Sequence, residues 1–209
     1  MLQPSCIILG GPNGSGKSSA YAKLQLDGVW INADEIAKTL TGSSDGRAAA
    51  LSAGKATIRK LAEMIETKTS FIYETTLSSQ QSVNLMRDAK AAGFSVALYY
   101  VALDTVDRNI ERVRQRVEAG GHDIPEADIR RRYEGSLDKL AAALSYADEA
   151  LLIDNSGLEP HEVFRIEAGA MVSADFDDRL YLHHRMVQSV CIAYGLYRFG
   201  SRNVFRKRP

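Results

Sequence analysis

A glycine-rich segment near the start of the sequence has the residue types and spacing of a phosphate-binding loop. Residues 11–18 are Gly-Pro-Asn-Gly-Ser-Gly-Lys-Ser, which satisfies the Walker A pattern G-x-x-x-x-G-K-[ST]. Glycine permits the tight turns that aim successive backbone N–H groups at an anion. The positive end of a following helix strengthens that field. The segment therefore predicts binding of a nucleoside triphosphate.

Each residue of this loop has an expected role. We expect Lys17 to reach the β- and γ-phosphates and the Ser18 hydroxyl to ligate Mg²⁺, so ATP and Mg²⁺ are the expected cofactors. The alternative is a glycine-rich turn with an incidental lysine. The predicted ATP-binding residues are Gly11, Pro12, Asn13, Gly14, Ser15, Gly16, Lys17, Ser18 and Ser19.

Acidic residues follow two of the predicted strands. Asp34 comes after a strand over 29–33, and Glu74 and Thr76 come after a strand over 71–73. Ligands of open parallel sheets bind outside the carboxyl ends of the strands. Phosphoryl transfer to an alcohol needs a carboxylate that accepts the proton of the acceptor. We expect Asp34 in that role, with Glu74 and Thr76 holding the acceptor or a metal-bound water.

Both acids have simpler alternatives. Asp34 is also a suitable N-cap for a helix over 35–40, because its carboxylate can accept from the first free amides of that helix. Glu74 could serve only to satisfy amides of its own loop. The acids are candidates for catalysis because they coincide with a phosphate loop.

Arginines gather in two clusters. The first, spaced four residues apart, consists of Arg108, Arg112 and Arg116. This spacing places them on one face of a helix predicted over 105–119. The second cluster is residues 130–132, beyond a Gly-Gly turn at 120–121. Two hinged clusters suit a lid over a triphosphate, whereas a solvated face with pairs such as Arg130 to Glu134 is the alternative.

Strands and helices must alternate to bring these residues together. The predicted strands are 5–10, 29–33, 71–73, 94–103 and 150–153. The predicted helices begin near residue 17 and continue at 35–40, 47–68, 79–92, 105–119 and about 129–144. This alternation predicts an α/β fold of the P-loop NTPase type. We expect a three-layer sandwich with a parallel sheet of five or slightly more strands, helices on both faces and an arginine-rich helical lid.

The last fifty residues interrupt this alternation. We expect residues 1–157 to form the kinase-like core and residues 158–209 to form an extension that packs on it or follows it. A strand or hairpin is expected over 161–172 and a helix over 179–197. The tail of residues 198–209 is basic and is expected to be solvated, the alternative being contact with nucleic acid or another anionic partner.

Length and charge exclude several classes of protein. The chain has 209 residues with 26 basic and 26 acidic side chains, so no basic excess favours nucleic acid or a membrane surface. No apolar run approaches the roughly 18 residues of a membrane span, and the first residues lack signal-peptide features. Cys6 and Cys191 are far apart and form no metal-ligand spacing. We expect a globular cytoplasmic protein without membrane partners.

Taken in order, these segments resemble the zeta toxin family of P-loop kinases. The resemblance covers about residues 5–157. Asn-Ala-Asp-Glu at 32–35 and Gly-Gly-His-Asp-Ile-Pro at 120–125 are more specific to this family than the loop. The matching segments are 10–18, 31–37, 73–78, 114–125 and 129–133. This chain departs from the longer toxins in its short middle region and its carboxyl end.

The resemblance implies a function. It implies phosphorylation of the 3′-hydroxyl of UDP-N-acetylglucosamine, or of a related sugar nucleotide, and inhibition by a small helical antitoxin. The alternatives are a kinase for nucleic-acid ends or another metabolite, and a slow ATPase that acts as a nucleotide-binding regulatory protein. Strong stimulation of ATP turnover by one acceptor would separate the kinases from the regulatory protein.

The resemblance also implies roles for individual residues. It makes Lys17 the phosphate lysine, Asp34 the acceptor base and Arg116 a phosphate clamp, with Glu74 and Thr76 on the substrate side. A second clamp is implied among residues 130–132, without a decision between the three. We select Arg131, because it faces away from the apolar stripe of its helix, whereas Arg130 lies at the shoulder of that stripe.

Overall fold

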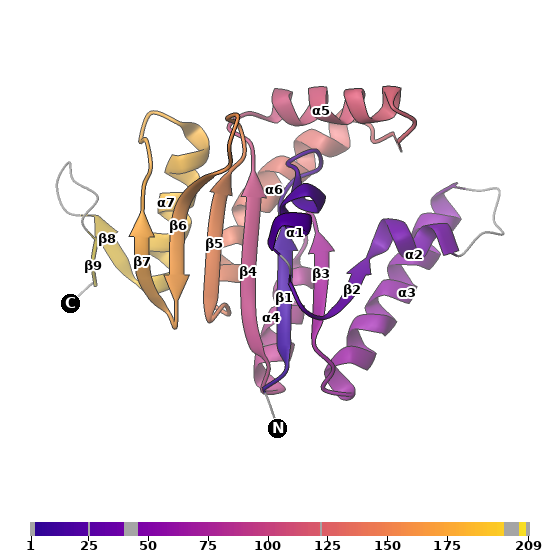
Figure 1. Cartoon of the computed structure of the whole chain (residues 1–209), viewed down its shortest axis with the longest axis horizontal. Helices are drawn as coiled ribbons and strands as arrows, with labels where there is room; N and C mark the ends of the chain where they lie inside the picture. The colour runs from indigo at the N-terminus through magenta and orange to yellow at the C-terminus, as the bar shows by residue number, and fades with distance from the viewer. Residues whose placement is uncertain (1–2, 25, 40–45, 122, 199–204, 208–209) are drawn as a thin grey trace.

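A seven-stranded sheet runs through the molecule (Figure 1). The computed structural model describes residues 3–24, 26–39, 46–121, 123–198 and 205–207 of the chain. The strands lie in the order β2-β3-β1-β4-β5-β6-β7. Their bounds are β1 Ser5–Gly10, β2 Val29–Asn32, β3 Phe71–Thr75, β4 Ser95–Ala102, β5 Glu149–Asp154, β6 His161–Glu167 and β7 Ala170–Ala174.

The first five strands in this order, β2, β3, β1, β4 and β5, are mutually parallel. This confirms the predicted fold class. Their carboxyl ends therefore meet at one edge of the sheet. The β6–β7 hairpin adds two antiparallel strands beyond β5. It lies where a strand or hairpin was predicted, so the sheet is slightly larger than its five parallel strands.

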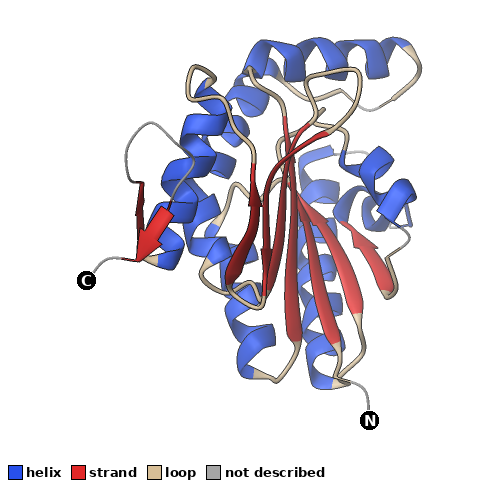
Figure 2. Cartoon of the chain, turned by 60° about the vertical axis from the view of Figure 1, so that its left-hand side comes forward, coloured by secondary structure: helices blue, strands red, loops and turns tan. Residues whose placement is uncertain are grey.

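Seven helices of the described residues connect and cover these strands. Their bounds are α1 Lys17–Leu24, α2 Ala33–Thr39, α3 Gly46–Glu66, α4 Gln80–Ala91, α5 Val106–Glu118, α6 Glu126–Leu144 and α7 Tyr181–Tyr194. The start of α5 is fixed by the side chain of Thr105, which accepts a hydrogen bond from the Arg108 amide. Helices lie on both sides of the twisted sheet (Figure 2).

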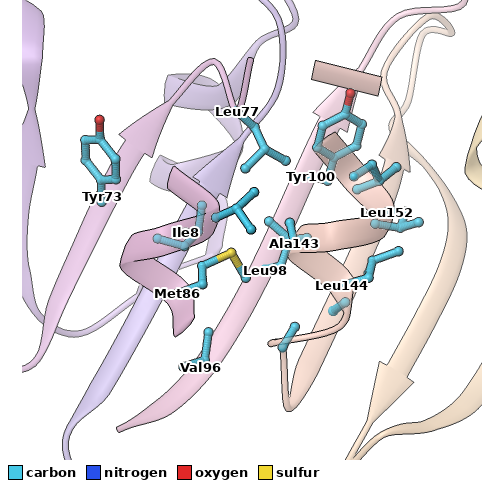
Figure 3. Close-up of a cluster of buried hydrophobic side chains, with 14 of the residues drawn as sticks. Ile8, Tyr73, Leu77, Met86, Val96, Leu98, Tyr100, Ala143, Leu144 and Leu152 are labelled. Atoms are coloured by element: carbon cyan, nitrogen blue, oxygen red, sulfur yellow. The ribbon is translucent and has the colours of Figure 1, made fainter. Parts of the chain in front are cut away.

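The two faces of the sheet are covered unequally. Helices α3, α4, α6 and α7 contribute to the larger hydrophobic core. Leu98 and Tyr100 of β4 lie between helices in this core (Figure 3), and the Tyr100 hydroxyl lies 3.0 Å from Ser136 Oγ of α6. On the other face Ala20 of α1 packs on a smaller cluster that includes Leu9 and Val101.

The part of the chain after residue 157 shares the same sheet and the same core. Strand β6 pairs with β5, and Leu182 and Met186 of α7 are fully buried in the larger core. Arg185 of α7 forms an ion pair of 3.0 Å with Glu134 of α6. We therefore propose that this extension folds together with the preceding core.

The end of the chain forms a second, small sheet. Strands β8 Leu196–Arg198 and β9 Phe205–Lys207 pair in antiparallel fashion. The remainder of the predicted basic tail lies outside the described residues. Among the helices that the structure describes, none has the length and apolarity needed to cross a membrane.

Candidate active site

The phosphate loop connects β1 to α1 at the carboxyl edge of the sheet. A side chain at Gly11 would place its Cβ only 2.0 Å from the carbonyl oxygen of Val101, and Gly14 has a φ of +77°. Glycine is therefore required at both positions. Helix α5 lies across this edge, above the loop (Figure 1).

Lys17 is buried beneath the loop. Its Nζ donates to the carbonyl oxygens of Gly11 (2.8 Å) and Pro12 (3.0 Å) and lies 3.8 Å from Glu74 Oε1. Burial lowers the pKa of Lys17 to about 8, although the carboxylates of Glu74 and Asp34 act in the opposite direction. The two carboxylates therefore offset only part of the effect of burial on the Lys17 ammonium.

A polar cavity of about 250 Å³ opens beside this lysine. It is formed by the phosphate loop, the ends of β2 and β3, and α6, which is the meeting of strand ends that the sequence predicted. The lining residues are Asn13, Lys17, Asn32, Ala33, Asp34, Tyr73, Glu74, Thr75, Thr76 and Arg132.

Asp34 is not the N-cap of α2. The side-chain Oδ1 of Asn32 accepts from the amides of Asp34 (2.7 Å) and Glu35 (3.3 Å). Asn32 therefore caps the helix, which begins at Ala33. The capping alternative for Asp34 is wrong, and its exposed carboxylate lines the cavity instead.

Glu74 is held by side chains of two other segments. Its Oε2 accepts from Asn32 Nδ2 at 2.8 Å and from Ser18 Oγ at 3.4 Å. The following turn is fixed by hydroxyl contacts, since Thr75 Oγ1 lies 3.0 Å from Ser82 Oγ and Thr76 Oγ1 lies 2.9 Å from Ser78 Oγ. Glu74 and Thr76 thus line the cavity from a turn that these hydrogen bonds hold.

Ser18 and Glu74 fit the requirements of Mg²⁺. Their oxygens are adjacent at the loop, and Mg²⁺ at phosphate sites is held by one or two protein oxygens together with phosphates and water. Across the described ranges, no three His, Cys, Asp or Glu side chains form a candidate metal cluster. These two residues would therefore hold the ion jointly with bound phosphates.

The first arginine cluster has two different roles. Arg108 Nη1 donates to the carbonyl oxygen of Ser156 (2.7 Å), and Arg112 Nη2 donates to that of Asn155 (2.9 Å). Both therefore hold the loop after β5. The positive charge of Arg116 contributes to lowering the pKa of Lys17, so Arg116 lies within electrostatic reach of that lysine.

In the second cluster it is Arg132 that reaches the phosphate loop. Arg132 Nη1 lies 3.2 Å from Asn13 Oδ1. The selected Arg131 is 67% exposed and pairs with Asp128, so the geometry favours Arg132 for the second clamp. The buried stripe of α6 includes Tyr133. Arg132 lies beside this stripe and contacts the loop, whereas Arg131 points away from the stripe.

Arg130 also differs from expectation. Its guanidinium pairs with Asp107 at 2.9 Å and with Glu126 at 2.8 Å. The expected partner Glu134 pairs instead with Arg185 of α7. Arg130 thus joins α6 to α5 at the surface.

Two asparagines that the sequence analysis missed contact the phosphate loop. Asn109 Nδ2 of α5 donates to the carbonyl oxygen of Asn13 (2.6 Å), and Asn155 Nδ2 donates to that of Ser15 (2.8 Å). The position of Asn155 directly after a predicted strand was an available signal. Nothing in the helical pattern distinguishes Asn109.

Two buried polar atoms beside the loop have no hydrogen-bond partner among the described residues. They are Ser15 Oγ and Asn109 Oδ1. Buried polar atoms are normally paired, so such atoms at a glycine-rich loop are consistent with a site for a polar ligand.

A second, largely apolar cavity of about 210 Å³ lies beside the first turn of α1. It is lined by Gly16, Ser19, Ala20, Val101, Ile153, Asn155 and Pro160.

The family model described as Zeta toxin matches residues 1–157. The chain belongs to the zeta toxin family. An uncharacterized protein of Haemophilus influenzae is 35% identical over 135 residues, which are 64% of this chain and 95% of that protein.

Solved structures share the fold of this zeta toxin family member. The AvrRxo1-ORF1:AvrRxo1-ORF2 structure with ATP has a TM-score of 0.55 at 16% identity, covering 95% of this chain and 66% of that chain. The PezAT chromosomal toxin–antitoxin system of Streptococcus pneumoniae has a TM-score of 0.55 at 16% identity, covering 77% and 72%. This chain spans less than two thirds of the matched chains in two further AvrRxo1-ORF1:AvrRxo1-ORF2 structures, 61% and 66% of their lengths.

Proposed function

We propose that this protein is an ATP-dependent kinase that transfers the γ-phosphate to a hydroxyl of a small molecule. The supporting observation is the single cavity that contains Lys17, Asp34, Glu74 and Arg132 beside a phosphate loop. Phosphoryl transfer depends on positioning and charge neutralisation more than on covalent catalysis by the protein. This cavity offers both.

The cations neutralise the phosphates in this proposal. Lys17 turns from the carbonyls of its loop to the β- and γ-phosphates, which the loop amides also contact. Arg116 and Arg132 approach from α5 and α6 and stabilise the charge on the transferring phosphoryl group. Mg²⁺, held by Ser18 and Glu74 with the phosphates, would supply further neutralisation of the phosphate oxygens when bound.

Asp34 acts on the acceptor. Its carboxylate orients the acceptor hydroxyl and takes the proton as the oxygen–phosphorus bond forms and the bond between the γ-phosphorus and ADP breaks. Because Asn32 already caps α2, Asp34 is available for this chemistry. It lies in the first turn of α2, directly after β2, and lines the same cavity as Asn13 and Lys17 of the phosphate loop.

The acceptor we propose is UDP-N-acetylglucosamine or a related sugar nucleotide. A sugar presents several hydroxyls, and the cavity wall offers carboxylates from Asp34 and Glu74, the Thr76 hydroxyl and the Asn32 amide. Such groups pair with sugar hydroxyls as acceptors and donors. We also propose a small helical antitoxin as partner, supported by the toxin–antitoxin system among the structural neighbours.

The test is transfer of label from γ-labelled ATP to a panel of sugar nucleotides. We expect one sugar nucleotide to be labelled by the wild-type protein. Asp34→Asn should reduce labelling by about 10²- to 10⁴-fold with unchanged melting temperature and ATP affinity, since the cap residue Asn32 is retained. Lys17→Ala is the control that should lose ATP binding itself.

Other outcomes would select another function. Hydrolysis of ATP that no acceptor stimulates would indicate a nucleotide-binding regulatory protein. Labelling of polynucleotide ends alone, lost on deletion of residues 198–209, would indicate a nucleic-acid kinase. Full transfer by Asp34→Asn would remove Asp34 from the mechanism and leave Glu74 as the next candidate base.

A further inference from the structure

We propose that His183 of α7 is a positioning residue for ATP, a role that rests on the proposed kinase function. His183 lies beyond residues 1–157, the part matched by the family model. It acts through the turn of residues 154–156, which follows β5 and contacts the phosphate loop. The segment after the family match thus supplies part of the support of the nucleotide site.

His183 is one half of a buried polar pair. Its side chain and that of Asp154 are 4% and 9% exposed, and Nε2 lies 3.0 Å from Asp154 Oδ2. The other ring nitrogen, Nδ1, accepts from the Asp177 amide at 2.9 Å. Because Nδ1 is an acceptor, Nε2 carries the proton and donates to Asp154. The ring also stacks on His161 at a centroid distance of 5.8 Å.

Asp154 passes this constraint to the turn that follows it. Its Oδ1 accepts from the amide of Ser156 at 2.9 Å and also from the Ser156 hydroxyl. Burial acts to raise the pKa of Asp154, but the hydrogen bonds from His183 and Ser156 outweigh burial and hold this pKa below its ordinary value. The carboxylate therefore stays charged and depends on these donors.

The turn in turn supports the phosphate loop. Asn155 Nδ2 donates to the carbonyl oxygen of Ser15 at 2.8 Å. This amide lies so close to Gly16 that a Cβ at that position would be 2.4 Å away. The Asn155 backbone amide donates to the carbonyl oxygen of Ala102 at 2.8 Å. A shift of the turn would therefore displace the backbone of Ser15 and Gly16 in the phosphate loop.

The same turn borders the apolar cavity beside α1. Asn155 and Pro160 both line this cavity of about 210 Å³. The cavity also borders Gly16 of the phosphate loop and Ser19 in the first turn of α1. The loss of the His183 donor should therefore weaken ATP binding, while the acceptor groups Asp34 and Glu74 stay untouched.

Two substitutions at residue 183 separate the two hydrogen bonds of the ring. The amide of His183→Gln can occupy the position of Nε2 and donate to Asp154, whereas it leaves the Asp177 amide without its acceptor. The amide of His183→Asn can occupy the position of Nδ1 and accept from Asp177, whereas it leaves Asp154 without its donor. The two variants thus each retain one contact.

The experiment is calorimetric titration of the full chain with ATP, together with steady-state kinetics. We expect His183→Asn to weaken ATP binding about tenfold, in line with loss of a charge-assisted hydrogen bond, and to raise the KM for ATP without changing kcat. His183→Gln should bind ATP within about twofold of wild type. Equal ATP affinity in the two variants would overturn the proposal.

Three further measurements separate a change in ATP affinity from a general loss of stability. Val190→Ala removes a fully buried side chain of the same helix and should lower the melting temperature without changing ATP affinity. Asn155→Ala should reproduce the weakened ATP binding. If His183→Asn does not fold, the imidazole signals of wild-type His183 are followed by NMR during ATP titration, and signals that do not shift would overturn the proposal.

The proposed function can fail separately. A wild-type protein that binds no ATP would overturn both proposals. A wild-type protein that binds and transfers phosphate, with His183→Asn unchanged in ATP affinity, would overturn only the role of His183.

Discussion

The three consecutive arginines of α6 point in different directions because successive helical residues are about 100° apart. Arg130 pairs with acidic residues of α5 and α6, and Arg131 pairs with Asp128. Only Arg132 of these three contacts the phosphate loop within the described structure, through Asn13. Of these three arginines, Arg132 is therefore the one placed to stabilise the charge of a transferring phosphoryl group.

Substitution of neighbouring arginines tests this assignment. Arg132→Ala should lower phosphoryl transfer by about 10³-fold or more, the effect typical of an arginine that stabilises a transferring phosphoryl group. The matched control Arg131→Ala should stay within about twofold, because an exposed ion pair contributes little. The measurement is kcat with saturating ATP and acceptor. A larger loss in Arg131→Ala than in Arg132→Ala would reverse the assignment.

The pKa of Lys17 predicts a pH dependence of ATP binding. Burial lowers this pKa to about 8, and the protonated form is the one that attracts phosphate. As pH rises through about 8, a growing fraction of the free protein loses this charge, so ATP affinity should fall by up to about tenfold per pH unit.

Calorimetry from about pH 7 to about pH 9 checks the expected fall. Binding should be accompanied by proton uptake near the upper end of this range, seen as a heat that depends on the buffer. Lys17→Arg serves as the control and should show no such dependence, because a guanidinium keeps its charge throughout this range. A wild-type affinity that does not change with pH would show that Lys17 keeps its proton throughout.

The residues of the site differ in how far their positions can be predicted from sequence. The phosphate loop follows a local pattern, and Asp34 and Glu74 follow strand ends, so simple rules place them in one cavity. The choice between Arg131 and Arg132 depends on which side of α6 meets the loop, which periodicity alone does not contain. The cap at Asn32 shows a similar limit, because two suitable cap residues lie two positions apart.

At the scale of elements, α5 and the phosphate loop are in close contact. A Cβ at Gly14 would lie 2.7 Å from the carbonyl oxygen of Asn109 in α5, and Gly14 has a φ of +77°. The loop and the helix therefore fix each other's position. The sequence predicted α5 and its arginines but not this backbone contact, because the contact joins segments distant in the chain.

Two glycine substitutions separate backbone strain from displacement of α5. Gly14→Ala and Gly93→Ala both force alanine into a positive φ, but nothing lies within 4 Å of a Cβ at Gly93. Each should lower the free energy of unfolding by about 1–2 kcal/mol through strain. Gly14→Ala should additionally reduce turnover by about 10²-fold through misplacement of the loop.

Denaturant unfolding and steady-state kinetics measure the two effects. Gly93→Ala is expected to keep wild-type turnover. If Gly14→Ala also kept wild-type turnover, α5 and the loop would not be coupled in the way that their contact indicates.

At the scale of the whole molecule, the core extends past the part of the chain that carries the family signature. Several side chains after residue 157 are buried in the larger core. They are Val163, Phe164, Ile166, Leu182, Met186, Val187 and Val190. The sequence indicated a hairpin and a helix here, but it did not show that they complete the same core, because short apolar runs do not identify their packing partners.

Truncation tests this shared core. A chain that ends at Gly157 should not fold, because each buried apolar side chain contributes about 1.5–3 kcal/mol and a protein of this size has a total stability of only about 5–15 kcal/mol. A chain that ends at Gly195, just after α7, is the control and should fold and bind ATP. Circular dichroism and thermal unfolding compare the two. Cooperative unfolding of the shorter chain would show that residues 1–157 are sufficient.

The contact between Asn155 and Ser15 spans 140 residues of sequence. Its two partners are therefore made at different times during synthesis. The phosphate loop leaves the ribosome before the turn that supports it. At about 5–20 residues per second, roughly 7 to 28 s pass before the turn that supports it is made. A nascent chain therefore carries the loop long before it carries a finished site. Translation products that stop before residue 155 carry the phosphate-loop motif without the Asn155 contact to it.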